Sequence, residues 1–208
     1  MSSIYKMKYL VIHCTASPLL DTVTPDFICK LHIGPKNNGN GTYLFKSKTY
    51  TEKQMKSKTI KLWSGARIPA LSVNGRGWRQ VGYSDMINSK GQLINLVPYS
   101  FDEVVNSYEV TNGASGYNSV SRHVVLVGGY VQKNGIWIKN GKDPKTGLYM
   151  KPEEIFNEDM MRTLRAYIEM QLRMVPSLIV VGHNQLTNQK TCPNFDVRKY
   201  LEREGLLQ

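Results

Sequence analysis

The stretch KYLVIH, residues 8–13, is an apolar run that ends in a polar residue. Its length and composition predict a short strand buried in a sheet. A second run of this kind, SLIVV at residues 177–181, leads directly into Gly182 and His183. Each predicted strand is thus followed or closed by a histidine, His13 or His183, at the place where sheets commonly present functional side chains. These two segments anchor the fold prediction.

Strands and helices are expected to alternate along the rest of the chain. The predicted strands are 83–87, 93–97 and 123–127, and the predicted helices are 25–32, 157–175 and 196–204. The helix at 157–175 gives the clearest pattern, because apolar residues recur there every four positions and Pro176 follows. Residues 99–118 are polar and predict a loop. This alternation predicts an α/β fold, a sheet covered by helices.

The positive charge of the chain is concentrated in one segment. The 208 residues carry a formal net charge of +11, and 41% of them are apolar, which is enough for a core. Residues 30–76 hold ten basic residues and one acidic residue, whereas the rest holds 17 basic and 15 acidic residues. Such a segment attracts nucleic acid, anionic membrane or anionic wall polymers, or it is a lysine-rich insertion without a partner.

Other classes of protein are excluded by what the sequence lacks. No run approaches about 18 apolar residues, so no membrane-spanning helix and no stable membrane insertion are expected. The first residues show no apolar stretch followed by a cleavage site, so we expect synthesis in the cytoplasm without a signal peptide. The three widely spaced cysteines, Cys14, Cys29 and Cys192, do not indicate a disulfide framework.

Three side chains have the chemistry of a metal site. His13 and His183 follow predicted strands, and Cys192 lies shortly after the second of them. Two imidazoles and one thiolate, with a water in the fourth position, form a catalytic zinc site, and zinc lowers the pKa of its bound water. The residues alone leave a simpler interpretation open, in which the histidines are polar strand ends and the cysteine is a small core residue.

Four short sequence motifs occur in order along the chain. They are VIHCTAS at 11–17, GWRQVGY at 77–83, LVGG at 126–129, and GH at 182–183 followed by KTCPNFD at 190–196. Together they resemble the zinc-dependent N-acetylmuramoyl-L-alanine amidases of the phage lysozyme type, which are related to the peptidoglycan recognition proteins. The resemblance covers about residues 8–24 and 77–203. It implies a mixed central sheet flanked by α-helices, with zinc in a surface groove.

The resemblance also implies a reaction and its residues. The reaction is hydrolysis of the amide between N-acetylmuramic acid and L-alanine in bacterial peptidoglycan. His13, His183 and Cys192 match the three zinc ligands of the family. Tyr83 matches the tyrosine that assists the zinc-bound water, and Lys190 matches the residue that stabilises the oxyanion. Lys190 as a solvent-exposed loop lysine and Tyr83 as a core aromatic are the simpler alternatives.

The chain departs from the phage pattern at three points, one of which is a loop between His183 and Cys192 that is one residue longer. Ser84 stands where that pattern usually has a histidine, and His13 and Tyr83 lie 70 positions apart, much farther than in the short phage enzymes. The excess falls on the basic segment. We therefore expect a single domain, residues 1–208, with a lysine-rich insertion at about 34–76. His32 is expected to be a groove-wall or packing residue, and His123 is expected to be structural.

The leading functional prediction is a zinc amidase that acts as an endolysin or lytic effector. Such a protein would work on the cell wall after release or delivery, as a monomer. The insertion would then bind anionic wall polymers. The alternative is a recognition module that binds peptidoglycan without cutting it. Nucleic acid is not expected as the main partner, because the basic segment lacks a recognisable motif.

Overall fold

The computed structural model describes residues 4–207 of the chain. The described residues form two compact units, unit 1 with residues 4–21 and 83–207, and unit 2 with Thr22–Gly82. Unit 2 therefore contains the expected insertion at 34–76 together with the helix that precedes it. A single domain spanning residues 1–208 stays a prediction.

Unit 1 is built on a five-stranded mixed sheet. Its strands in spatial order are β14 (Ile179–Gly182), β2 (Tyr9–Cys14), β11 (Ser121–Leu126), β8 (Asp85–Ile87) and β9 (Leu93–Asn95). The first four strands run parallel and β9 pairs antiparallel with β8. The core strands β2 and β11 are almost wholly buried, as apolar runs in a parallel sheet require. The predicted α/β fold with a mixed sheet is confirmed.

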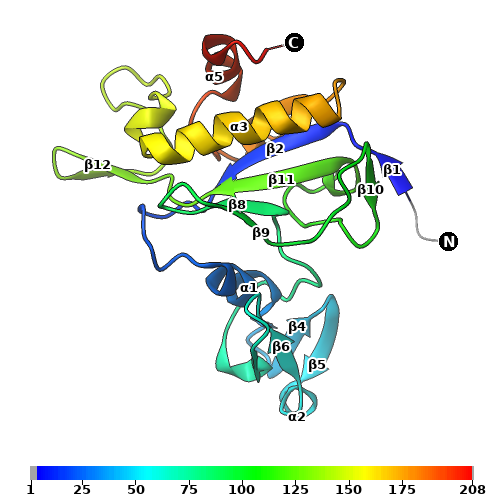
Figure 1. The fold of residues 1–208 in the computed structure, drawn as a ribbon. Coiled ribbons are helices and arrows are strands. Elements are labelled where there is room, and N and C mark those ends of the chain that lie inside the picture. The colour runs from blue at the N-terminus through cyan, green and yellow to red at the C-terminus, as the bar shows by residue number, and fades with distance from the viewer. Residues whose placement is uncertain (1–3, 208) are drawn as a thin grey trace. The chain divides into compact units, whose positions relative to one another are not determined.

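Helix α3 (Glu158–Met174) lies along this sheet, as Figure 1 shows. Asn157 caps it, because the Asn157 side chain accepts a hydrogen bond from the backbone N–H of Met160 at 2.9 Å. The predicted stripe is buried, with Met160, Leu164 and Ile168 each 0% exposed. Two further helices follow β14, the short α4 (His183–Leu186) and α5 (Val197–Glu204).

Unit 1 also contains strands that the sequence does not predict. Within the segment predicted as a loop, β10 (Val104–Asn106) pairs antiparallel with β1 (Ile4–Lys6). The loop prediction is wrong at these positions, because the pairing partner lies about a hundred residues earlier and leaves no local signal. Strands β12 (Val131–Lys133) and β13 (Ile136–Ile138) form a hairpin. Two single turns complete the unit, η2 (Asn118–Val120) and η3 (Pro152–Glu154).

Unit 2 begins with α1 (Pro25–Ile33), which Thr24 caps through the backbone N–H of Phe27. Its remaining elements are β3 (Lys36–Asn37), β4 (Thr42–Phe45), β5 (Lys48–Thr51), α2 (Glu52–Met55), β6 (Thr59–Lys61), β7 (Arg67–Pro69) and η1 (Ala70–Ser72). Strands β3, β4 and β5 form one antiparallel sheet, and β6 and β7 form another. Phe45, Met55 and Ile60 are at most 3% exposed, so this unit has a small core of its own.

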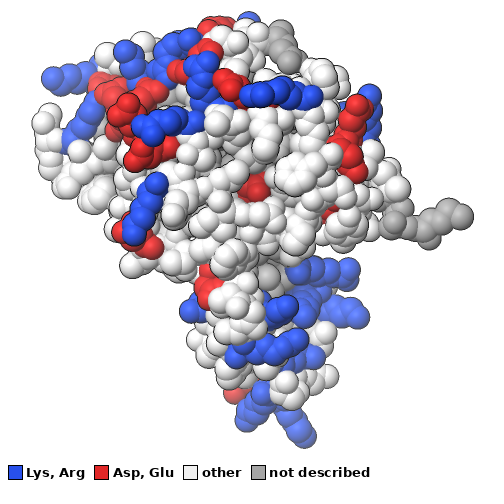
Figure 2. Space-filling view, viewed as in Figure 1, with Lys and Arg blue, Asp and Glu red and all other residues white. Residues whose placement is uncertain are grey.

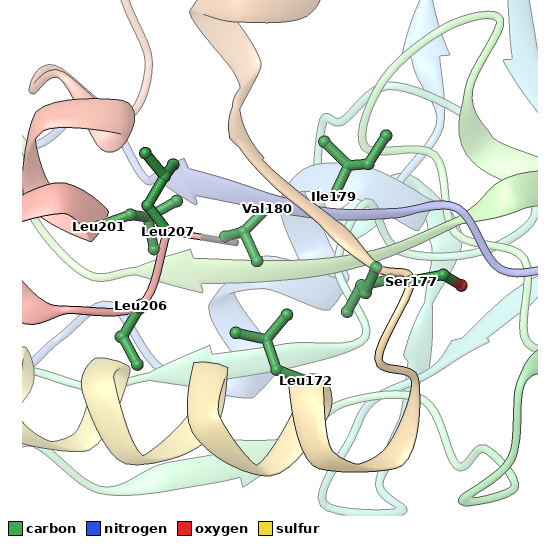
Figure 3. Close-up of a pocket in the computed structure, with 8 residues that line it drawn as sticks. Leu172, Ser177, Ile179, Val180, Leu201, Leu206 and Leu207 are labelled. Atoms are coloured by element: carbon green, nitrogen blue, oxygen red, sulfur yellow. The ribbon is translucent and has the colours of Figure 1, made fainter.

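Unit 1 has an apolar hollow of about 190 Å³ beside β14. Figure 3 shows the side chains around it, which come from α3, from β14 and the two residues before it, and from the segment at and after α5. Leucines dominate its wall, and none of the predicted site residues lines it. The hollow is therefore not the candidate functional site.

None of the helices found within residues 4–207 is both long and apolar enough to cross a lipid bilayer.

Candidate metal centre

The structure brings the three predicted metal ligands together. One ligand atom from each of His13, His183 and Cys192 can be chosen so that all three lie within 4.8 Å of one another. Nδ1 of His13 lies 3.7 Å from Sγ of Cys192, and the rings of His13 and His183 are 4.8 Å apart between centroids. The three side chains can therefore hold a metal ion.

The sheet explains why two of these residues meet. Strands β2 and β14 are parallel neighbours, with Ile12 opposite Gly182, so both strands end at the same edge of the sheet. His13 lies near the end of β2, and His183 follows the last residue of β14 and begins α4. The apolar runs that predict the strands thus place the two imidazoles side by side.

Hydrogen bonds hold the segment that carries Cys192. The backbone N–H of Asn184 donates to the carbonyl of Cys192 at 2.7 Å, which ties this segment to α4. The amide of Asn194 donates to the carbonyl of Gly129 at 2.7 Å and to that of Lys139 at 3.1 Å. A Cβ on Gly182 would lie 2.8 Å from Pro193, so the close approach of strand and segment needs glycine there.

Sequence reasoning missed these two asparagines. Asn194 is 1% exposed and adopts a positive φ of 73°, a conformation that asparagine tolerates better than most residues. An asparagine directly after Cys-Pro was the available signal, since it indicates a turn whose side chain can bond to neighbouring backbone.

The protonation states of the cluster depend on burial and on one nearby cation. Burial and then the side chain of Cys14 raise the pKa of the Cys192 thiol, while the backbone N–H of Cys14, 3.1 Å from Sγ, and the charge of Lys190 act in the opposite direction. Burial and then Lys190 lower the pKa of His183. The imidazole of His183 is therefore kept neutral, as metal binding requires. A bound cation would oppose the raised pKa of Cys192 and favour its thiolate.

The donor set fits zinc. Two imidazole nitrogens and one thiolate sulfur are the ligands that zinc takes in proteins, whereas magnesium and calcium prefer oxygen. Three protein ligands also leave a position open, which is typical of catalytic rather than structural zinc sites.

The two predicted catalytic residues lie at the same cluster. The ring of Tyr83, which is half-buried, is 5.2 Å from the ring of His13 between centroids. Lys190 is exposed, and its charge acts on both His183 and Cys192. His13, His183, Cys192 and Tyr83 thus lie together, and Lys190 lies near enough for its charge to act on two of the candidate ligands.

His123 is also at the cluster, although the sequence predicts only a structural role for it. Its Nδ1 lies 3.0 Å from Nε2 of His13, and its side chain is wholly buried. Burial, and then the neighbouring His183, lower the pKa of His123 to about 3. Ser84 is beside it, since the Ser84 backbone N–H donates to the His123 carbonyl at 2.8 Å.

His32 belongs to unit 2. Its Nδ1 accepts a hydrogen bond from the backbone N–H of Gly82 at 3.0 Å, and its ring packs against Trp78 at 4.9 Å between centroids. It is 3% exposed, in agreement with the packing role predicted for it.

Solved structures share the fold of this chain. The endolysin N-acetylmuramoyl-L-alanine amidase LysCS from Clostridium intestinale matches with a TM-score of 0.53 and 15% identity, over 98% of this chain and 86% of that one. The amidase LysC from the same organism matches with a TM-score of 0.52 and 16% identity, over 98% and 88%. The Ph2119 endolysin of a Thermus scotoductus bacteriophage matches with a TM-score of 0.50 and 17% identity, over 99% and 88%.

Neither a family model nor a curated protein sequence matches the chain. At identities of 15–17% the structural likeness shows the fold. That fold is the one implied by the four short sequence motifs, so the resemblance is confirmed at the level of the fold.

Proposed function

We propose that this chain, which has the fold of the endolysin amidases, is itself a zinc-dependent N-acetylmuramoyl-L-alanine amidase. One observation carries the proposal: His13 and Cys192 are 179 positions apart in sequence, yet the fold brings them together with His183 into a set that fits zinc. The substrate is bacterial peptidoglycan. The protein acts as a monomeric endolysin or lytic effector, on the wall, after release or delivery.

Each residue has a defined part in the hydrolysis. His13, His183 and Cys192 hold the zinc, which when bound supplies Lewis acidity and activates water. The Tyr83 hydroxyl orients the attacking water and relays a proton toward the leaving nitrogen. The Lys190 ammonium stabilises the negative charge that develops on the carbonyl oxygen. The products are a carboxylate on the lactyl group and a free amino group on L-alanine.

Digestion of purified peptidoglycan tests the proposal. We expect the zinc-loaded protein to release stem peptides that begin at L-alanine, identified by mass spectrometry. Cys192→Ser should lose both zinc stoichiometry and activity. Cys29→Ser is the matched control, because this buried cysteine lies in α1 of unit 2 and is not a member of the ligand cluster.

Two outcomes would contradict the amidase proposal. Zinc-loaded protein that cuts no peptidoglycan from several wall chemotypes would exclude the enzyme. Wild-type protein that binds peptidoglycan but no metal would instead support a recognition module.

We also propose that unit 2 binds anionic polymers of the cell wall. Residues 22–82 carry eleven Lys and Arg side chains and two acidic ones, a net charge of +9. None of these eleven cations forms an ion pair within the described part of the chain, whereas many cations of unit 1 do. Figure 2 shows the resulting blue surface over β4 to β6 with little red in it. These charges remain available to an anionic partner.

A further inference from the structure

His123 is a second partner of His13, and the hydrolysis described above does not use it. Nδ1 of His123 lies 3.0 Å from Nε2 of His13, and the two side chains are 0% and 1% exposed. The strand register explains the contact. Val125 of β11 lies opposite His13 of the parallel strand β2, and His123 lies two residues earlier on the same face. The contact is thus built into the central pair of strands rather than into a loop.

The two ring nitrogens of His13 face different groups. Nδ1 faces Cys192, with 3.7 Å between Nδ1 and Sγ, and Nε2 faces His123. A nitrogen that binds a metal must be unprotonated, so the other nitrogen of the neutral imidazole carries the proton. With a metal at Nδ1, the Nε2–H of His13 donates and the Nδ1 of His123 accepts.

The second ring nitrogen of His123, Nε2, lies in a different environment from Nδ1. Nε2 of His123 is buried and has no hydrogen-bond partner among residues 4–207. An unpaired polar group in a protein interior is unfavourable, and an apolar side chain would occupy the same place without that loss. The core of unit 1 therefore contains a costly imidazole whose one described hydrogen bond goes to a candidate metal ligand.

We propose that His123 is a positioning residue, which fixes the tautomer and the orientation of His13 by accepting a hydrogen bond from its Nε2–H. The proposal rests on the proposed function, because only a metal at His13 gives this orientation a catalytic consequence. Hydrogen bonds from outer groups to metal-binding histidines change metal affinity by about 10–100-fold. The acceptor in this protein is a neutral histidine from the adjacent strand.

Zinc affinities measured by competition with a chelator test the proposal. His123→Phe removes the acceptor and keeps an aromatic ring, so zinc affinity should fall about 10–100-fold. His123→Asn keeps an acceptor close to the position of Nδ1 and should restore most of that affinity. Val124→Ala is the control for lost packing, because Val124 is 0% exposed and points to the other face of the same strand. It should bind zinc like the wild type.

Histidine nitrogen NMR of the metal-free protein gives a readout independent of zinc and of activity. We expect neutral His13 to be protonated at Nε2 in the wild type and to become a mixture of tautomers in His123→Phe. Protonation of wild-type His13 at Nδ1, unchanged zinc affinity in His123→Phe, or equal loss in all three variants would each overturn the proposal. If the wild type binds no zinc, the proposed function fails, and the tautomer of His13 still decides the role of His123.

Discussion

Lys190 is the exposed member of the candidate site, so its charge can be removed with little effect on packing. We expect Lys190→Met to lower kcat about 100-fold, the loss typical of one oxyanion-stabilising group, with zinc stoichiometry unchanged. Steady-state kinetics on a soluble muramyl peptide measure this effect. Lys199→Met is the control, since Lys199 is also exposed and lies on α5. Equal kcat values for the two variants would remove Lys190 from the mechanism.

His32 makes the stability of unit 2 dependent on pH. Burial and then the charge of Arg76 lower its pKa to about 4, from an ordinary value of 6.5. Between these values the unfolded chain binds more protons than the folded one, so stability is fully present above pH 6.5 and is lost as the pH falls toward 4. Relative to His32→Asn, which does not titrate, the wild type should lose up to about 3 kcal/mol. Denaturant unfolding across this pH range measures the difference.

At the scale of single residues, the sequence predicts a functional side chain where that residue belongs to a short sequence motif. His13, Tyr83, His183, Lys190 and Cys192 all lie in such motifs; the first three and Cys192 lie in one cluster, and the charge of Lys190 acts on it. His123 belongs to no such motif. Its contact with His13 depends on the register of two parallel strands 110 positions apart, and that register is a property of the assembled sheet.

The loop after β13 packs closely against the segment that carries Cys192. Gly141 of that loop has a φ of 70°, and a Cβ there would overlap the carbonyl oxygen of Asn194 and lie 2.7 Å from its Cβ. We expect Gly141→Ala to displace this segment and to weaken zinc binding about tenfold, although residue 141 is not a ligand. Calorimetry of zinc binding measures the loss.

Gly147→Ala is the matched control for this element. Gly147 has nearly the same φ, 69°, but a Cβ there meets no atom within 4 Å. Gly147→Ala should lose about 1 kcal/mol because of the left-handed backbone, and Gly141→Ala should lose more because its Cβ also overlaps Asn194. Only Gly141→Ala should also lose zinc affinity, and equal affinities in the two variants would show that the contact with Asn194 does not position Cys192.

Helices and strands differ in how well the sequence predicts their boundaries. Helix α3 is predicted almost to the residue, because its cap, its apolar stripe and Pro176 are all local signals. The strands of unit 2 are two to four residues long, and no strand boundary there could be fixed beforehand. Tyr43 and Tyr50 show why: they face each other across β4 and β5, and only that pairing explains their spacing.

At the scale of the whole molecule, the effect of where the positive charge lies on wall binding can be measured separately from the effect of the net charge. Changing the exposed Lys46, Lys48, Lys53 and Lys56 of unit 2 to Gln should weaken binding to purified cell wall about tenfold and reduce its salt dependence. Zinc affinity should not change. Co-sedimentation with wall fragments at several salt concentrations measures the effect.

A control set keeps the same net charge. It changes four exposed lysines of unit 1 to Gln, namely Lys8, Lys145, Lys151 and Lys199. If both sets weaken wall binding equally, the partner responds to total charge and unit 2 is not its binding surface.

The spatial order of the sheet has a consequence for biosynthesis. Strand β2, which carries His13, is synthesised well before its neighbour β14, His183 and Cys192, although the folded sheet places these residues together. A nascent chain that stops at residue 178 therefore contains one ligand and lacks the other two. In the proposed amidase, translation products that stop before His183 should therefore neither bind zinc nor hydrolyse peptidoglycan.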